Sequence, residues 1–174
     1  MGAGGSVARP NGGFRVTSFL STFENKVDRK GRVSVPAPFR TALAGESFQG
    51  IIAYPSMADR AAIDAFGRSV LEELNRRRFD RTMQDGNFEA ALLGGDSVVD
   101  TIMALAHELP FDSEGRIVLP ASLAEPAGIG DRATFVGRGS RFQIWAPEAY
   151  ARHEKAAVEA LRARVGRNGG EGSK

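Results

Sequence analysis

One short segment occurs twice in this chain of 174 residues, and the repeat constrains the fold more than any other feature. Residues 28–37 read Asp-Arg-Lys-Gly-Arg-Val-Ser-Val-Pro-Ala, and residues 112–121, which lie 84 positions later, read Asp-Ser-Glu-Gly-Arg-Ile-Val-Leu-Pro-Ala. The Asp, Gly, Arg, Pro and Ala positions coincide, which indicates a doubled unit. Because a unit this small buries little apolar surface alone, we expect the two copies to share one core.

Each copy carries the residues of a tight β-hairpin. Asp28 and Asp112 suit the first position of a type I turn, where a carboxylate accepts backbone N–H bonds. Gly31 and Gly115 suit the left-handed residue that closes a bulged hairpin. We therefore assign these four residues to turn structure, with each aspartate also able to pair with the arginine four residues later. The two residues between Asp and Gly then point outward.

Further elements follow each turn. We expect short buried strands at Arg32–Val35 and Arg116–Leu119, and brief helices at Phe39–Leu43 and Ser122–Ala127. The second half continues with a hairpin of Ala133–Val136 and Phe142–Trp145, and we match Phe48–Pro55 to Arg141–Pro147 as its shorter counterpart. Apolar stripes predict longer helices at about Met57–Arg76 and about Glu148–Val165.

These patterns divide the chain into five segments. They are a flexible Gly-rich N-terminal extension (1–15), a first repeat with its helix (16–76), a helical connector (77–107), a second repeat with its helix (108–165) and a disordered tail (166–174). Within the connector we expect two helices, Phe88–Leu93 and Val98–Leu105, separated by Gly94 and Gly95.

The doubled Asp-x-x-Gly-Arg motif, each copy followed by Val/Ile-x-Val/Leu-Pro-Ala, and the segment Phe-Gln-Ile-Trp-Ala-Pro-Glu at 142–148 resemble the MraZ family of bacterial transcription regulators. The resemblance covers roughly residues 17–155. It implies an α+β fold with a β-barrel-like core of two tandem AbrB-like, swapped-hairpin repeats and peripheral helices. It also implies a ring-shaped homo-oligomer without catalysis. Such a protein binds double-stranded promoter DNA at repeated boxes of the division and cell-wall gene cluster.

The two repeats differ in charge. Residues 24–41 carry five basic and two acidic residues, a net charge of +3, whereas residues 108–125 carry one basic and four acidic residues, a net charge of −3. We therefore expect Arg29, Lys30 and Arg32 to form the DNA face. The family resemblance adds Arg116 to the DNA-binding residues. Two alternatives stay open: Arg32 serves only as the partner of Asp28, and Arg29 and Lys30 form a solvated hairpin tip.

Composition argues against several other functions. The chain has no cysteine and two histidines, and His153 lies on a helix stripe that suits packing better than metal binding. We expect no catalytic residues, no metal, no cofactor and no small-molecule substrate. Without an apolar run of membrane-spanning length or a recognisable secretory leader, we expect no membrane partner and a cytoplasmic, nucleoid-associated protein. The acidic second repeat favours one alternative function, an oligomeric protein-interaction scaffold related to AbrB-like antitoxins.

Overall fold

A computed structural model describes residues 18–86, 89 and 98–168. The elements of the first half are β1 (Thr22–Lys26), β2 (Arg32–Ser34), α1 (Ala37–Ala42), β3 (Gly50–Pro55), β4 (Ala62–Phe66) and α2 (Arg68–Gln84). Those of the second half are α4 (Val98–Leu105), β5 (His107–Pro110), β6 (Arg116–Val118), α5 (Ala121–Ala124), β7 (Arg132–Gly137), β8 (Phe142–Trp145) and α6 (Pro147–Asn168). The expected α+β class is confirmed.

The strands of the two halves are interleaved. One antiparallel sheet has the order β1-β7-β8-β4-β3-β5, and a second sheet pairs β2 with β6. Exchanging β1–β4 for β5–β8 reverses the strand order of the large sheet, so the strands of the two halves occupy equivalent places in it. The pairings β1–β7, β5–β3, β4–β8 and β2–β6 all join one half to the other. The shared core expected from the repeat is thus built into the strand pairing.

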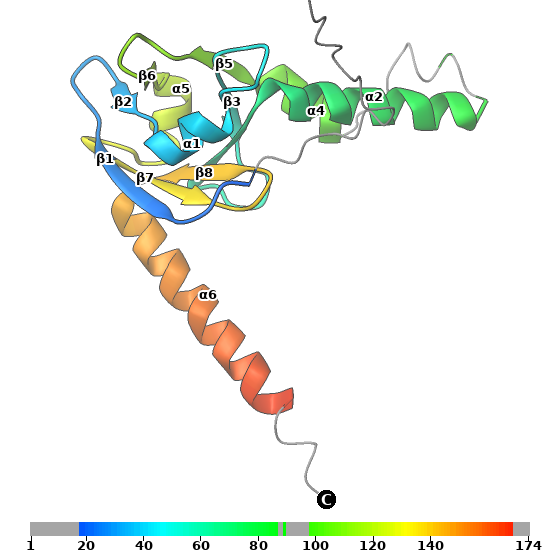
Figure 1. Ribbon diagram of the computed structural model, residues 1–174. Helices are drawn as coiled ribbons and strands as arrows, with labels where there is room; N and C mark the ends of the chain where they lie inside the picture. Colours follow the sequence, from blue (N-terminus) through cyan, green and yellow to red (C-terminus); the bar gives the residue numbers. More distant parts are fainter. Residues whose placement is uncertain (1–17, 87–88, 90–97, 169–174) are drawn as a thin grey trace, which may run out of the picture.

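The large sheet is open. Its edge strands are β1 and β5, and no pairing joins them within the described residues. The barrel-like closure expected from the family resemblance is therefore not detected. The small β2–β6 sheet, with α1 and α5, instead covers one face of the large sheet (Figure 1).

Residues of the repeated segment occupy the centre of the main core. Val33 and Ile117 lie opposite each other in β2 and β6, and each is at most 1% exposed. Val35 and Leu119, two residues further along, are also buried. Phe39 from α1 joins this core, where its ring centroid lies 5.0 Å from that of Phe142. The apolar positions that the two copies share are thus positions where the halves meet.

The opposite face of the large sheet is covered by the longer helices. One cluster there joins Ile52, Tyr54 and Phe66 of the sheet to α2 and to Ile102 of α4. A second cluster, which includes Trp145, packs under the start of α6. Beyond this start, α6 projects away from the sheet, whereas α2 projects to another side of the molecule (Figure 1).

The predicted helix over Met57–Arg76 is wrong in its first half. Residues 62–66 form strand β4, and helix α2 begins at Arg68 and continues to Gln84. All five residues of β4 are buried because the strand lies inside the sheet with both faces covered. A strand buried on both faces loses its polar alternation, so the helical spacing of Ile63 and Phe66 was misleading.

The match between Phe48–Pro55 and Arg141–Pro147 is also wrong. The strand order makes β3 the counterpart of β7, and β4 the counterpart of β8. The first half therefore contains a complete β3–β4 hairpin. A similar local sequence appears here in strands that occupy different places in the sheet.

Other expected elements agree with the structure. The short helices α1 and α5 follow the two prolines, and α4 matches the expected helix Val98–Leu105. Helix α6 matches the long C-terminal helix but extends to Asn168, so residues 166–168 of the predicted disordered tail are helical. The expected helix at Phe88–Leu93, apart from Glu89, lies outside the described residues, as do the glycine break at 94–95, the extension 1–15 and residues 169–174.

Candidate nucleic-acid interface

The first hairpin turn is organised by Asp28. Its Oδ1 accepts the backbone N–H groups of Lys30 and Arg32, both at 2.9 Å. The backbone N–H of Gly31 donates to the carbonyl of Asp28, and Gly31 has a φ of +76°. This left-handed conformation favours glycine over residues with a Cβ. The turn thus directs the side chains of Arg29 and Lys30 into solvent, where both are exposed.

The second hairpin repeats this arrangement. Asp112 Oδ1 accepts the backbone N–H groups of Glu114 and Arg116, both at 2.9 Å. Gly115 has a φ of +73°, and a Cβ built there would collide with the guanidinium of Arg40 from α1. Gly115 is therefore restricted by its backbone conformation and by a close neighbour.

Each turn aspartate also holds the arginine four residues later. Arg32 Nε donates to Asp28 Oδ2 at 2.6 Å, and Arg116 Nε donates to Asp112 Oδ2 at 2.7 Å. The backbone N–H of the arginine, followed by its side chain, lowers the pKa of each aspartate below its ordinary value. Both carboxylates are therefore charged at neutral pH, and each fixes the orientation of its arginine guanidinium through Nε.

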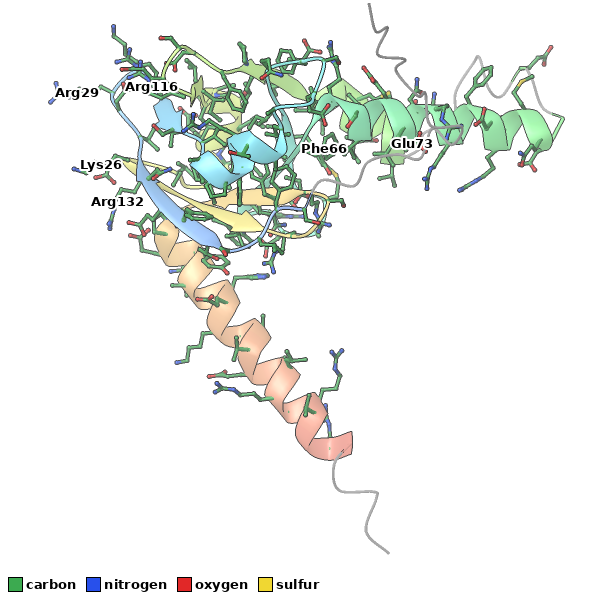
Figure 2. All side chains as sticks on the ribbon, viewed as in Figure 1. Lys26, Arg29, Phe66, Glu73, Arg116 and Arg132 are labelled. Carbon is green, nitrogen blue, oxygen red and sulfur yellow. The ribbon has the colours of Figure 1, made fainter. Side chains whose placement is uncertain are left out.

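The two turns form one continuous surface. The backbone N–H of Leu119 donates to the carbonyl of Gly31 at 2.8 Å, and the N–H of Val35 donates to the carbonyl of Gly115 at 3.1 Å. Figure 2 shows Arg29 and Arg116 at the same edge of the molecule. A polyanion bound at one turn therefore lies close to the other.

Comparison with known sequences identifies the family. Residues 102–167 match the sequence model of a family described as "MraZ protein, putative antitoxin-like". A protein of Parvibaculum lavamentivorans named "Transcriptional regulator MraZ" is 41% identical over 138 residues, which cover 78% of this chain and 80% of the relative. The chain belongs to the MraZ family. Proteins of the same name from Rhodospirillum rubrum and Beijerinckia indica are 44% and 40% identical, over 75% and 83% of this chain and 81% and 83% of their own lengths.

Membership of the MraZ family also decides the question of catalysis. MraZ transcriptional regulators are not enzymes, which agrees with the expectation from the sequence. His153 packs against the Trp145 ring at a centroid distance of 4.7 Å, and its Nδ1 lies 3.2 Å from a carboxylate oxygen of Asp59. Within the part of the chain that the structure describes, no group of three or more acidic or histidine residues could hold a metal. No helix there has the length and apolar character needed to cross a bilayer.

The two turns of this MraZ chain differ in their charges. Arg29 and Lys30 of the first turn have no ion-pair partner among the described residues, and Arg32 has only Asp28 there. The second turn places Ser113 and Glu114 at the equivalent positions. Arg116 is held twice, because its Nη2 also lies 2.6 Å from Glu114 Oε2. The first turn is thus the one that offers available cations.

The structure adds cations that the motif did not identify. Lys26, at the end of β1, is exposed and lies opposite Arg132 in β7 (Figure 2). Arg132 pairs with Glu24, so it is less available than Lys26. The charge count of the first repeat included Lys26. Placing Arg132 beside it requires the β1–β7 pairing, which no local sequence pattern reveals.

Proposed function

We propose that this chain is a DNA-binding transcription regulator that contacts double-stranded promoter DNA through its paired hairpin turns. Arg29, Lys30 and Arg32 make the main contacts, and Arg116 makes a secondary one. The observation that carries the proposal is the exposed first turn, whose cations lack a carboxylate partner apart from the Asp28–Arg32 pair within the described residues. Membership of a family of transcriptional regulators also implies DNA binding.

The two kinds of cation in the first turn suit two kinds of contact. Arg29 and Lys30 extend freely from the tip, so they suit phosphate oxygens, which position a protein on the duplex. The Nε of Arg32 is held by Asp28, so the guanidinium has a fixed orientation and its Nη atoms stay available. An arginine held in this way suits the O6 and N7 acceptors of guanine in the major groove. We therefore assign base reading to Arg32.

The proposal includes an assembly. The two repeats act as AbrB-like swapped hairpins, and several copies form a ring that binds repeated boxes upstream of the division and cell-wall genes. The interleaved strand pairing supports the swapped-hairpin part. A ring increases affinity without new contacts when the spacing of the boxes matches the spacing of the subunits. Such a protein works in the cytoplasm, associated with the nucleoid.

A gel-shift titration tests the proposal. The probes are the DNA upstream of the chain's own gene and a scrambled fragment of equal length. We expect the wild-type protein to prefer the upstream DNA, and Arg32→Ala to lose this preference while it keeps weak binding to both fragments. Arg77→Ala is the matched control, because this α2 arginine is exposed and paired with Glu73. Absence of binding to any fragment at low salt contradicts the proposal.

The ring has its own test. Mass measurement of the purified protein at micromolar concentration is expected to return a multiple of the 18.6 kDa chain. A monomer at that concentration contradicts the ring and leaves DNA binding to single subunits.

A second candidate function is an oligomeric scaffold that binds a protein partner, as AbrB-like antitoxins do. The acidic second turn favours it, because Glu114 is exposed and phosphate repels it. The scaffold predicts that the chain binds a basic protein partner and that DNA affinity lacks a strong dependence on salt.

A further inference from the structure

One position differs in sign between the two turns. Lys30 and Glu114 are equivalent residues, each two positions after the turn aspartate and two before the motif arginine. The backbone around them is the same, because both N–H groups donate to the turn carboxylate at 2.9 Å. The two turns therefore place a cation, Lys30, and an anion, Glu114, in the same backbone environment.

This difference changes the state of the motif arginine. The side chains of Arg32 and Arg116 are similarly exposed, at 35% and 29%, and their bonds to the turn aspartates are nearly equal in length. Arg116 differs because Glu114 also binds its Nη2 at 2.6 Å. The hydrogen bond that Arg116 donates to Asp112, together with the charges of Asp112, Glu114 and Asp28, raises the pKa of Arg116 above its ordinary value. Glu114 thus occupies the end of the guanidinium that Arg32 leaves available.

Glu114 is paired with an arginine whose charge interacts with Asp28 of the first turn. The backbone bonds between Gly31 and Leu119, and between Val35 and Gly115, join the two hairpins, and the β2–β6 register pairs Arg116 with Ser34, two residues from Arg32. Charges within the Debye length of about 8 Å at physiological salt are only partly screened, so Glu114, bound to Arg116, acts on any phosphate that Arg116 reaches. The side chain of Glu114 is 65% exposed, so it can respond to a bound duplex.

We propose that Glu114 is a specificity-determining residue that withholds Arg116 from DNA phosphates. On non-cognate DNA, Glu114 stays paired with Arg116, and its own charge is repelled by the backbone. On cognate DNA, a base edge replaces the pair: Arg116 binds acceptors such as guanine O6 and N7, while Glu114 accepts from an exocyclic amine. The second turn therefore weakens binding to wrong sequences more than to the right one. This inference rests on the proposed function, in which the first turn binds DNA.

A set of three variants tests the proposal by fluorescence anisotropy on upstream and scrambled DNA across a salt series. We expect Glu114→Gln to tighten binding to scrambled DNA by roughly two- to fivefold, the effect of one surface ion pair. Its slope of log affinity against log salt is expected to steepen by about 0.9, for one added phosphate contact. Binding to upstream DNA is expected to change less, so discrimination falls. Glu114→Gln combined with Arg116→Ala is expected to lose the gain, and Lys30→Gln, at the equivalent position, is expected to weaken binding to both DNAs.

Two results overturn the proposal while leaving the proposed function intact. In the first, Glu114→Gln binds both DNAs as the wild type does. In the second, its gain persists when Arg116 is replaced, which means that Glu114 acts by repulsion alone. If no variant binds any DNA at low salt, the proposed function fails and this proposal fails with it.

A second measurement examines the ion pair without DNA. Phenylglyoxal modifies arginines whose guanidinium is free, and peptide mass spectrometry gives a rate for each site. We expect Arg116 to react more slowly than Arg32 in the wild type, and to approach the rate of Arg32 in Glu114→Gln. Arg32 in the same sample is the internal control. If the rate at Arg116 is unchanged in the variant, Glu114 does not keep the Arg116 guanidinium from reacting, and the proposal is contradicted.

Discussion

Arg29 and Lys30 carry the sequence-independent part of the proposed binding. Each is exposed, and neither has an ion-pair partner among the described residues. A cation without a partner releases counterions from DNA without first giving up a carboxylate, so it contributes fully to salt-dependent affinity. This state separates these two residues from Arg116, although all three lie on the same paired turns.

The first prediction concerns these two cations. Arg29→Ala and Lys30→Ala are each expected to reduce the slope of log affinity against log salt by about 0.9, with little change in preference between DNA sequences. Fluorescence anisotropy at several salt concentrations measures the slope. Ser113→Ala is the matched control, because Ser113 occupies the position equivalent to Arg29 in the second turn. Slopes equal to that of the wild type would show that this tip does not touch phosphate.

The second prediction concerns Asp112 and pH. Its folded-state pKa is lowered, chiefly by the backbone N–H of Arg116, so it stabilises the fold above its unfolded pKa of about 4. This contribution is lost as the pH falls through the lower folded-state pKa. We therefore expect Asp112→Asn to be less stable than the wild type at pH 7, and the two to converge in strong acid. Urea unfolding at several pH values measures the difference, and a constant difference down to pH 2 contradicts the assignment.

The third prediction concerns Gly115. An alanine there adopts an unfavourable left-handed conformation, at a cost of about 1–2 kcal/mol, and also collides with Arg40. Gly128 has a similar φ of +66°, and an added Cβ there meets nothing within 4 Å. Gly115→Ala is therefore expected to lower the free energy of unfolding more than Gly128→Ala. Equal losses in denaturant unfolding would show that Arg40 moves aside freely.

At the scale of elements, the sequence predicted what repeats locally and missed what depends on distant pairing. The motif located β2, β6, α1 and α5, because turn residues and prolines mark them directly. Strand β4 was read as helix, because burial between β3 and β8 removes the alternation that identifies a strand. The ion pair between Glu114 and Arg116 is also local in sequence. Counting charges gives only the net charge of the segment and does not reveal the pairing.

The anchor of α2 is another feature that only the structure reveals. Glu46, which follows α1, accepts the backbone N–H of Ser69 at 2.9 Å and its hydroxyl at 2.6 Å. The carboxylate thus caps the first turn of α2 from a position 23 residues away, where it also favours the positive end of the helix dipole.

The fourth prediction follows from this anchor. Glu46→Ala is expected to cost about 0.5–2 kcal/mol of stability and to speed amide hydrogen exchange in the first turn of α2. Glu72→Ala, which removes an exposed carboxylate from α2 itself, is the control. The hairpin turns lie on another part of the molecule, so DNA affinity is expected to stay unchanged. Exchange rates that match the wild type would show that α2 does not depend on this cap.

At the scale of the whole molecule, duplication has produced a symmetric frame with an asymmetric surface. The core pairs, such as Val33 with Ile117, keep their apolar character in both halves, since each half completes the sheet of the other. The exposed tips differ, the first being basic and the second acidic, because a solvent-facing position places no such demand on the fold. Packing thus preserves the repeat, and the surfaces are where the halves acquire different roles.

The fifth prediction tests this interdependence. The chain is divided after residue 97, before α4, and the two halves are purified separately. Each half alone lacks the partners of most of its strands, so we expect neither to be a folded monomer by circular dichroism and size-exclusion chromatography. Mixing the halves is expected to restore the spectrum of the intact chain. The control is intact protein cut at the same place after folding, which should remain associated. The prediction fails if one half unfolds cooperatively on its own as a monomer. In that case the β3–β4 or β7–β8 hairpin and its helix are enough to form a core, and the interleaved pairing only joins two independent units.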